Sequence, residues 1–316
     1  MNLIGDADLL PAEAALALIL EAVQPLAPLD LPLLDAHGAT LASNLLIDDE
    51  VILPAGKRIG PKEIGMAASF GLDHLPARPH PRVVVLSAGA DLVSPGSSTI
   101  NLKNRESDFE PEFESNSWML TTLAREIGAK SFRVHTIAKD PQNLKLIIED
   151  QLVRADLLVI SGEENDESFS LISDVLMQLG EIRVFRTSEQ ANVRFNFGQI
   201  GIDKVPVLTL PGEPIVNFLS GLLFVKPLIE RMLNLKSQSN KKINIKASTS
   251  FDLPSNNGNS AFANLIPVVI NSSGAIEILN NVEDFSIFVK ATHLLKVSDL
   301  AKPIKTGDLL ELIELD

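Results

Sequence analysis

The chain has 316 residues, a formal net charge of −14 and a sequence pI near 4.8. Because this acidity comes without a block of Lys or Arg, we expect no binding to nucleic acid. The absence of cysteine excludes disulfides, thiolate metal sites and cysteine nucleophiles. No cationic segment precedes an apolar run at the N-terminus, and the longest apolar stretches are too short to cross a bilayer, so we predict no membrane contact and a cytoplasmic protein.

Residues 1–79 are predicted to form an N-terminal helical segment, the first of two or three domains expected for this length. Leu and Ala recur at helical spacing over residues 11–23, and Pro25 ends that helix. A helix or turn, an extended stretch and a further helix follow, over residues 34–44, 45–53 and 63–70. Gly71 provides the C-terminal cap of the last helix.

Residues 80–235 are predicted to form an α/β domain with a central three-layer, mostly parallel sheet. The apolar run at residues 83–86 is typical of a parallel strand buried on both faces. Further strands and helices then alternate: strands over residues 131–138, 156–160 and 205–210, and helices over residues 117–128, 141–152, 169–179 and 215–233.

Residues 236–316 are predicted to form a C-terminal β domain, a small barrel or sandwich. A linker rich in Lys, Ser and Asn separates it from the α/β domain. Short strands are predicted over residues 243–247, 266–270, 275–279, 286–289 and 309–315.

Three of the predicted parallel strands end in glycine-bearing turns, at residues 87–89, 161–163 and 210–214. Ligands of open α/β sheets bind outside the carboxyl ends of the strands, where glycines let backbone N–H groups approach an anion. The turns therefore predict a site for a small anionic, phosphate-bearing ligand. The alternative is that the glycines only permit tight turns.

Carboxylates crowd the same end of the predicted sheet and suit Mg²⁺, which would bridge them to a phosphorylated ligand. They are Asp91, Glu114, Glu163, Glu164, Asp166, Glu167 and Glu213. The alternative is that residues 163–167 form a solvated acidic loop. The histidines match no zinc spacing, and no Gly-x-Ser-x-Gly nucleophile elbow is present.

Four segments occur in the order, and roughly at the spacing, of one protein family. They are residues 53–61 (Leu-Pro-Ala-Gly-Lys-Arg-Ile-Gly-Pro), 81–96, 114–120 (Glu-Ser-Asn-Ser-Trp-Met-Leu) and 210–214 (Leu-Pro-Gly-Glu-Pro). The set resembles the molybdopterin molybdenumtransferases, the MoeA and gephyrin E-domain family. The resemblance covers most of the chain, since Gly307-Asp308 before the last strand is similar to the family's C-terminal β domain.

The resemblance implies a molybdopterin-binding-like central domain and a role in molybdenum cofactor biosynthesis. It implies a Mg²⁺-dependent transferase that inserts molybdate into adenylylated molybdopterin. By position, it assigns catalytic and metal-binding roles to Asp91 and Glu114. It assigns molybdopterin-binding roles to Ser87, Gly89, Ser115, Asn116, Ser117, Ser161, Gly162, Gly212 and Glu213.

The chain resembles a shortened and divergent member of that family. The family's Asp-Gly-Tyr-Ala motif and inserted β domain are absent where Asp48-Asp49-Glu50 runs directly into Val51. Acidic residues 163–167 and the glycine-poor segment 186–196 replace a glycine-rich and a lysine-bearing loop, changes that disfavour close backbone approach to phosphate. The alternative function is a catalytically inactive paralogue that binds or regulates in the same pathway. A homodimer, or a partner protein of the pathway that supplies the missing motif, stays open.

Overall fold

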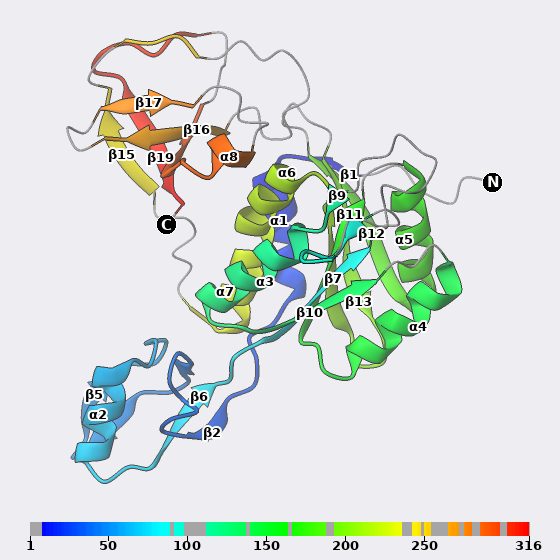
Figure 1. Ribbon diagram of the computed structural model, residues 1–316. Coiled ribbons are helices and arrows are strands. Elements are labelled where there is room, and N and C mark those ends of the chain that lie inside the picture. Colours follow the sequence, from blue (N-terminus) through cyan, green and yellow to red (C-terminus); the bar gives the residue numbers. More distant parts are fainter. Residues whose placement is uncertain are drawn as a thin grey trace.

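The computed structural model describes residues 8–88, 92–97, 112–136, 140–163, 166–187, 193–235, 242–247, 250–253, 265–271, 275–279, 285–297 and 302–315. Figure 1 shows a central α/β domain, with a lobe of residues 29–78 and a C-terminal β sheet lying on separate sides of it. In the described residues, no helix combines the length and the apolar character that crossing a bilayer requires.

The central sheet has seven strands in the order β1-β12-β13-β14-β11-β7-β10. Their bounds are β1 (Asp8–Leu10), β7 (Arg82–Ala88), β10 (Lys130–Thr136), β11 (Leu157–Glu163), β12 (Gly180–Thr187), β13 (Arg194–Ile200) and β14 (Val205–Pro211). Every pairing is parallel except those of β13 with β12 and β14. The prediction of a large, mostly parallel sheet is confirmed, although the sequence analysis missed β1 and the β12–β13 pair.

Helices cover both faces of the sheet, which gives the three layers. One face carries α1 (Ala12–Ala22), α3 (Asn116–Ile127), α6 (Pro214–Ser220) and α7 (Lys226–Met232), and the other carries α4 (Pro141–Leu152) and α5 (Asp166–Leu179). A π-helical segment, Gly221–Val225, joins α6 to α7. Along β7, Val83 and Val85 enter one core while Val84 and Leu86 enter the other. This alternation is why the strand is apolar at every position.

The predicted N-terminal helical segment is corrected by the structure, because residues 29–78 form a mixed lobe. Its elements are β2 (Leu29–Pro32), β3 (Thr40–Leu41), β4 (Leu45–Ile47), β5 (Glu50–Leu53), α2 (Pro61–Ser69) and β6 (His74–Arg78). Leu41 and Leu75 are buried in the lobe's own core, so strand pairing outweighs helical propensity here. Asp48 and Asp49, both with positive φ, make a two-residue turn between β4 and β5.

The lobe contacts the central domain through the chain segment that joins them. The imidazole of His80 lies between the carbonyl oxygens of Gly128 (Nδ1, 2.5 Å) and His37 (Nε2, 2.9 Å). The guanidinium of Arg78 donates to the carbonyl of Leu26. By contrast, α1 packs in the core of the central domain and not in that of the lobe. The predicted domain limits at residues 79/80 and 235/236 stay predictions.

The C-terminal region forms an antiparallel sheet of five strands in the order β15-β19-β18-β16-β17. Their bounds are β15 (Lys242–Lys246), β16 (Leu265–Ile270), β17 (Ile276–Ile278), β18 (His293–Lys296) and β19 (Leu309–Glu314). The predicted strand at residues 286–289 is wrong: this segment is the helix α8 (Phe285–Phe288), and β18 was missed. Phe288 packs edge-on against Phe218 of α6, 5.8 Å between centroids, so tertiary packing overrides β propensity.

Candidate functional site

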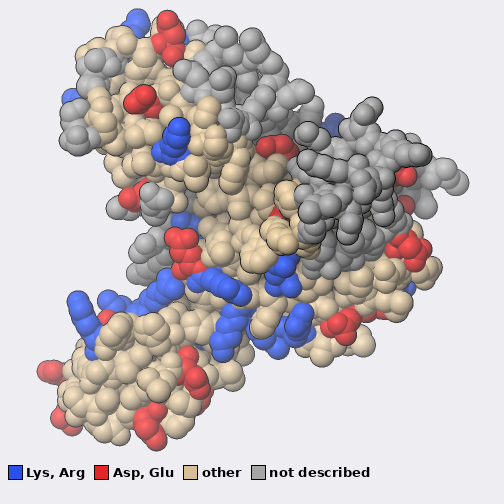
Figure 2. Space-filling model, in the orientation of Figure 1, with Lys and Arg blue, Asp and Glu red and all other residues tan. Residues whose placement is uncertain are grey.

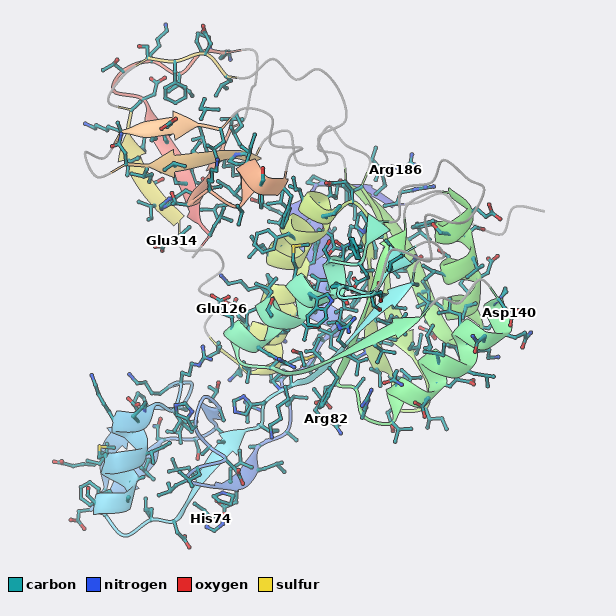
Figure 3. All side chains as sticks on the ribbon, viewed as in Figure 1. His74, Arg82, Glu126, Asp140, Arg186 and Glu314 are labelled. Atoms are coloured by element: carbon teal, nitrogen blue, oxygen red, sulfur yellow. The ribbon has the colours of Figure 1, made fainter. Side chains whose placement is uncertain are left out.

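The strand ends that carry the predicted site lie side by side at the carboxyl edge of the central sheet. β7, β11 and β14 are neighbours, and Ser161 is in register with both Ser87 and Leu210. Figure 3 shows Arg186 near the carboxyl end of β12 and Arg82 at the start of β7, which mark the two opposite edges. Turns at residues 87, 161–162 and 212 therefore share one edge.

Gly162 brings the ends of β11 and β7 into direct contact. Its φ is +131°, and a Cβ at this position would lie 1.7 Å from the carbonyl oxygen of Ala88. No side chain fits into that space, so only glycine allows the two backbones to approach so closely. The structure thus gives Gly162 a conformational reason to be in the predicted set.

Two asparagines tie the helices to the strand ends. Asn116 donates from Nδ2 to the carbonyl of Gly212 (2.6 Å), which joins the start of α3 to the β14 turn. Asn217 donates from Nδ2 to the carbonyl of Pro211 (2.7 Å) and to the hydroxyl of Ser161 (3.0 Å). The sequence analysis did not select Asn217, although a polar residue inside the apolar run 215–225 was a usable signal.

Glu114 lies at the start of α3, and both oxygens of its carboxylate accept hydrogen bonds. The side chain is completely buried; Oε1 accepts from the backbone N–H of Ser117 (2.7 Å) and Oε2 from the Ser117 hydroxyl (2.6 Å). Arg133 Nη1 lies 3.6 Å from Oε2. Ser115 is the N-cap residue of α3 and makes no side-chain capping bond.

Glu213 also caps a helix, but at the surface. Its carboxylate accepts from the backbone N–H groups of Ile215 (3.1 Å) and Val216 (2.7 Å) at the start of α6. Gly89 and Asp91 lie outside the described residues. Across the described segments, no three His, Asp or Glu side chains converge as a metal site would require. Glu114 and Glu213 therefore act as hydrogen-bond acceptors at the starts of α3 and α6, and the predicted Mg²⁺ site stays a prediction.

Several buried polar atoms at this edge have no hydrogen-bond partner among the described residues. They include Ser87 Oγ, Asn116 Oδ1 and Asn217 Oδ1. Because both asparagine amides donate to carbonyls, their Oδ1 atoms are fixed as acceptors. Buried polar atoms normally find a partner, so a bound polar ligand or ordered water would satisfy them.

Two arginines lie at this edge of the sheet. Arg186 at the end of β12 stands directly opposite Arg194 at the start of β13. The Arg194 guanidinium also lies 4.5 Å from the ring centroid of Phe169 in α5. These side chains place positive charge beside the end of β12 and the start of β13.

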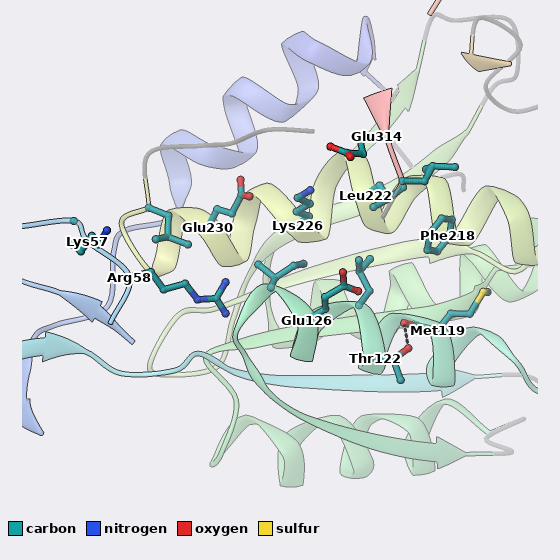
Figure 4. Close-up of a pocket in the computed structure, with 15 residues that line it drawn as sticks. Lys57, Arg58, Met119, Thr122, Glu126, Phe218, Leu222, Lys226, Glu230 and Glu314 are labelled. Atoms are coloured by element: carbon teal, nitrogen blue, oxygen red, sulfur yellow. Dashed lines mark hydrogen bonds between the residues drawn. The ribbon is translucent and has the colours of Figure 1, made fainter. Parts of the chain in front are cut away.

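A separate cavity of about 710 Å³ contains none of the predicted site residues. Figure 4 shows it between the lobe, α3, α7 and the C-terminal sheet, and Figure 2 shows Lys and Arg side chains gathered around the junction of lobe and central domain. Its charged lining residues are balanced: Lys57, Arg58 and Lys226 face Glu126, Glu230 and Glu314. Its lining therefore offers an anion no net attraction.

Comparison with known proteins points to one family. The chain is 31% identical over 188 residues to molybdopterin molybdenumtransferase 1 of Mycobacterium tuberculosis, and 28% identical over 192 residues to molybdopterin molybdenumtransferase 2 of the same organism. The chain is similar to the molybdopterin molybdenumtransferases. Each match covers 58% of this chain but only 41% and 44% of these relatives, so the chain matches less than half of their length.

Solved structures show that the fold is shared over nearly the whole chain. The molybdopterin biosynthesis MoeA protein of Pyrococcus horikoshii aligns with a TM-score of 0.69 over 98% of this chain and 99% of its own, at 16% identity. A molybdenum cofactor biosynthesis protein of Pyrococcus furiosus aligns with a TM-score of 0.65, also at 16% identity. No protein-family model matches the chain.

Proposed function

We propose that the chain acts in molybdenum cofactor biosynthesis and binds molybdopterin, or its adenylate, across the carboxyl edge of the central sheet. One observation carries this proposal: the Gly162–Ala88 contact and the Asn116–Gly212 hydrogen bond join the ends of β7, β11 and β14 and the start of α3 at one edge of the sheet. The similarity to molybdopterin molybdenumtransferases supports the identity of the ligand.

The residues of this edge would hold the ligand through backbone and polar side-chain groups. The first turn of α3 adds the positive end of the helix dipole and its remaining N–H groups, since the Ser117 N–H is already bonded to Glu114. The buried acceptors Asn116 Oδ1 and Asn217 Oδ1 suit the N–H donors of a pterin ring. Arg186 and Arg194 add positive charge beside the turns.

The proposed activity is that of the transferase, insertion of molybdate into the dithiolene of adenylylated molybdopterin. A binding or regulatory role without catalysis is the second candidate, and a specific observation favours it. Glu114 and Glu213, two of the three carboxylates predicted to face the ligand, are engaged as helix caps. A metal would have to bind each carboxylate through its remaining lone pairs while the carboxylate also holds the first turn of its helix.

Titration of the purified chain with molybdopterin and with its adenylate, in the presence and absence of Mg²⁺ and molybdate, tests the proposal. Calorimetry measures binding, and cofactor fluorescence after oxidation measures turnover. Binding with turnover supports the transferase, and binding without turnover supports the second candidate. No binding of either compound contradicts both.

We further propose a cytoplasmic location and an assembly as a homodimer or with a partner protein of the pathway. The sequence match, which covers less than half of the relatives' length, motivates the second point. Light scattering of the purified chain measures its mass in solution. A monomer that turns over the adenylate by itself would contradict the need for a second chain.

A further inference from the structure

Arg133, in β10, lies between an aromatic ring and a buried carboxylate. Its Cζ is 4.2 Å from the ring centroid of Trp118, the only tryptophan of the chain. Its Nη1 is 3.6 Å from Glu114 Oε2. The Glu114 side chain has no exposed surface, while that of Arg133 is 27% exposed. The guanidinium thus covers the outer side of the carboxylate.

The Glu114 carboxylate needs a counter-charge that Ser117 does not supply. Ser117 gives it two hydrogen bonds, from a backbone N–H and a hydroxyl, and both groups are neutral. A buried charge that is hydrogen-bonded but unpaired is costly. Arg133 Nη1 is itself buried and makes no hydrogen bond within the described part of the chain. The two groups therefore compensate each other across 3.6 Å.

The Arg133–Glu114 pair affects the ligand site through the first turn of α3. Glu114 holds the backbone N–H of Ser117, and Asn116, the first residue of the same turn, donates to the carbonyl of Gly212 at 2.6 Å. A shift of the first turn of α3 would break that bond and separate the α3 start from the β14 turn. Because β10 is packed against α3 by the Ser131 hydroxyl bond to the Thr121 carbonyl, Arg133 comes from a fixed strand.

We propose that Arg133 is a positioning residue for the molybdopterin-class site. It supplies the charge that keeps Glu114 against the first turn of α3, and so keeps Asn116 on the β14 turn. This inference rests on the proposed function. Arg133 lies outside every motif segment that the sequence analysis selected, because its partner is brought to it only by the packing of α3 on β10.

The test is a double-mutant cycle read as the dissociation constant of molybdopterin. We expect Arg133→Gln to weaken binding about 10- to 100-fold, as misplacement of positioning groups typically does. In Arg133→Gln/Glu114→Gln no unpaired charge remains, so the double variant should recover most of the loss. A residue that only packs on Trp118 would show no such recovery.

Arg154→Gln is the matched control, because Arg154, like Arg133, stacks on an aromatic ring. Its Cζ lies 5.1 Å from the ring centroid of Phe132. It lies far from the α3 start in sequence and pairs with Gln151, so ligand affinity should stay at the wild-type value. Arg133→Lys keeps the charge and remains informative if Arg133→Gln does not fold. It should bind within a few-fold of wild type.

Trp118 emission reports whether the stack has been lost in each variant, independently of ligand. Arg133→Lys binding as weakly as Arg133→Gln, or losses that add in the double variant, would overturn the counter-charge role. Unchanged binding by a folded Arg133→Gln variant would overturn this inference alone. A wild-type chain that binds no molybdopterin would overturn the proposed function and this inference with it.

Discussion

The helices α3 and α6 both begin at the carboxyl edge of the sheet, and a glutamate caps each of them in a different environment. Glu114 is buried against Arg133, whereas Glu213 is exposed and accepts from two backbone N–H groups. Both carboxylates accept backbone N–H groups at a helix start. Removal of the buried carboxylate leaves its charged partner unpaired, whereas removal of the exposed one does not. The burial of each glutamate, and not its residue type, therefore determines how much stability its replacement costs.

The largest loss of stability is expected at the contact between the ends of β7 and β11. Gly162→Ala would place a Cβ 1.7 Å from the Ala88 carbonyl oxygen, so β7 and β11 must separate. We expect a loss of more than about 4 kcal/mol in the free energy of unfolding. Gly71→Ala is the control, because Gly71 has φ +79° and open space around it. It should cost only about 1 kcal/mol. Urea unfolding of both variants measures the difference, and equal losses would disprove the contact.

Replacement of the buried glutamate, Glu114, is expected to give the second-largest loss of stability. Glu114→Ala removes two hydrogen bonds and leaves Arg133 without its carboxylate. Since the pair is partly screened by the exposed side of Arg133, we expect the low end of the range for a broken buried pair, about 3 kcal/mol. Thermal and urea unfolding measure this loss, and a value below about 1 kcal/mol would place Glu114 with ordinary surface caps.

The exposed cap should matter less. Glu213→Ala removes the acceptor of the Ile215 and Val216 N–H groups, which water can then reach. We expect a loss of about 1 kcal/mol, typical of an N-cap. Glu213→Asp, which keeps a carboxylate at the N-cap, should lose less than Glu213→Ala in the same unfolding experiment. A loss equal to that of Glu114→Ala would remove the contrast between the two starts.

A third capping glutamate, in the lobe, gives the smallest effect and depends on pH. Burial raises the pKa of Glu63, but backbone hydrogen bonds, including the one from Gly60, and Lys57 at 3.6 Å outweigh it and leave the pKa below its ordinary value. The stabilisation is therefore present above the unfolded pKa, about 4.3, and is lost as the pH falls through the folded value. Urea unfolding from neutral to acidic pH should show a shallower acid-side fall for Glu63→Gln than for wild type. Parallel profiles would contradict the cap.

The parts of the fold that the sequence predicted are those with local signals. Apolar runs gave the strands β7, β11 and β14, and glycine-bearing turns gave their ends at one edge. The strands β12 and β13 were missed because their own hydrophobic pattern does not identify them, and only their pairing with neighbouring strands does. Residues 286–289 were predicted as a strand because β propensity cannot register the contact of Phe288 with Phe218.

The site residues also fall into those with a local sequence signal and those without one. Glycine and serine positions in the turns could be selected from the sequence, since their spacing after strands is visible. Asn217 interrupts an apolar run and could have been selected for that reason, whereas Arg133 carries no local signal, because only tertiary packing brings Glu114 to it. Glu114 was selected because it lies in a motif segment, and its contacts with Ser117 and Arg133 became visible only in the structure.

Amide hydrogen exchange with and without molybdopterin tests most directly whether the strand ends act as one site. Slower exchange is expected together at residues 87–88, 115–117, 161–163 and 212–213, with no change in the lobe of residues 29–78. Protection confined to the α3 and α7 segments that line the separate cavity, or to one strand end alone, would contradict a single ligand site at the carboxyl edge.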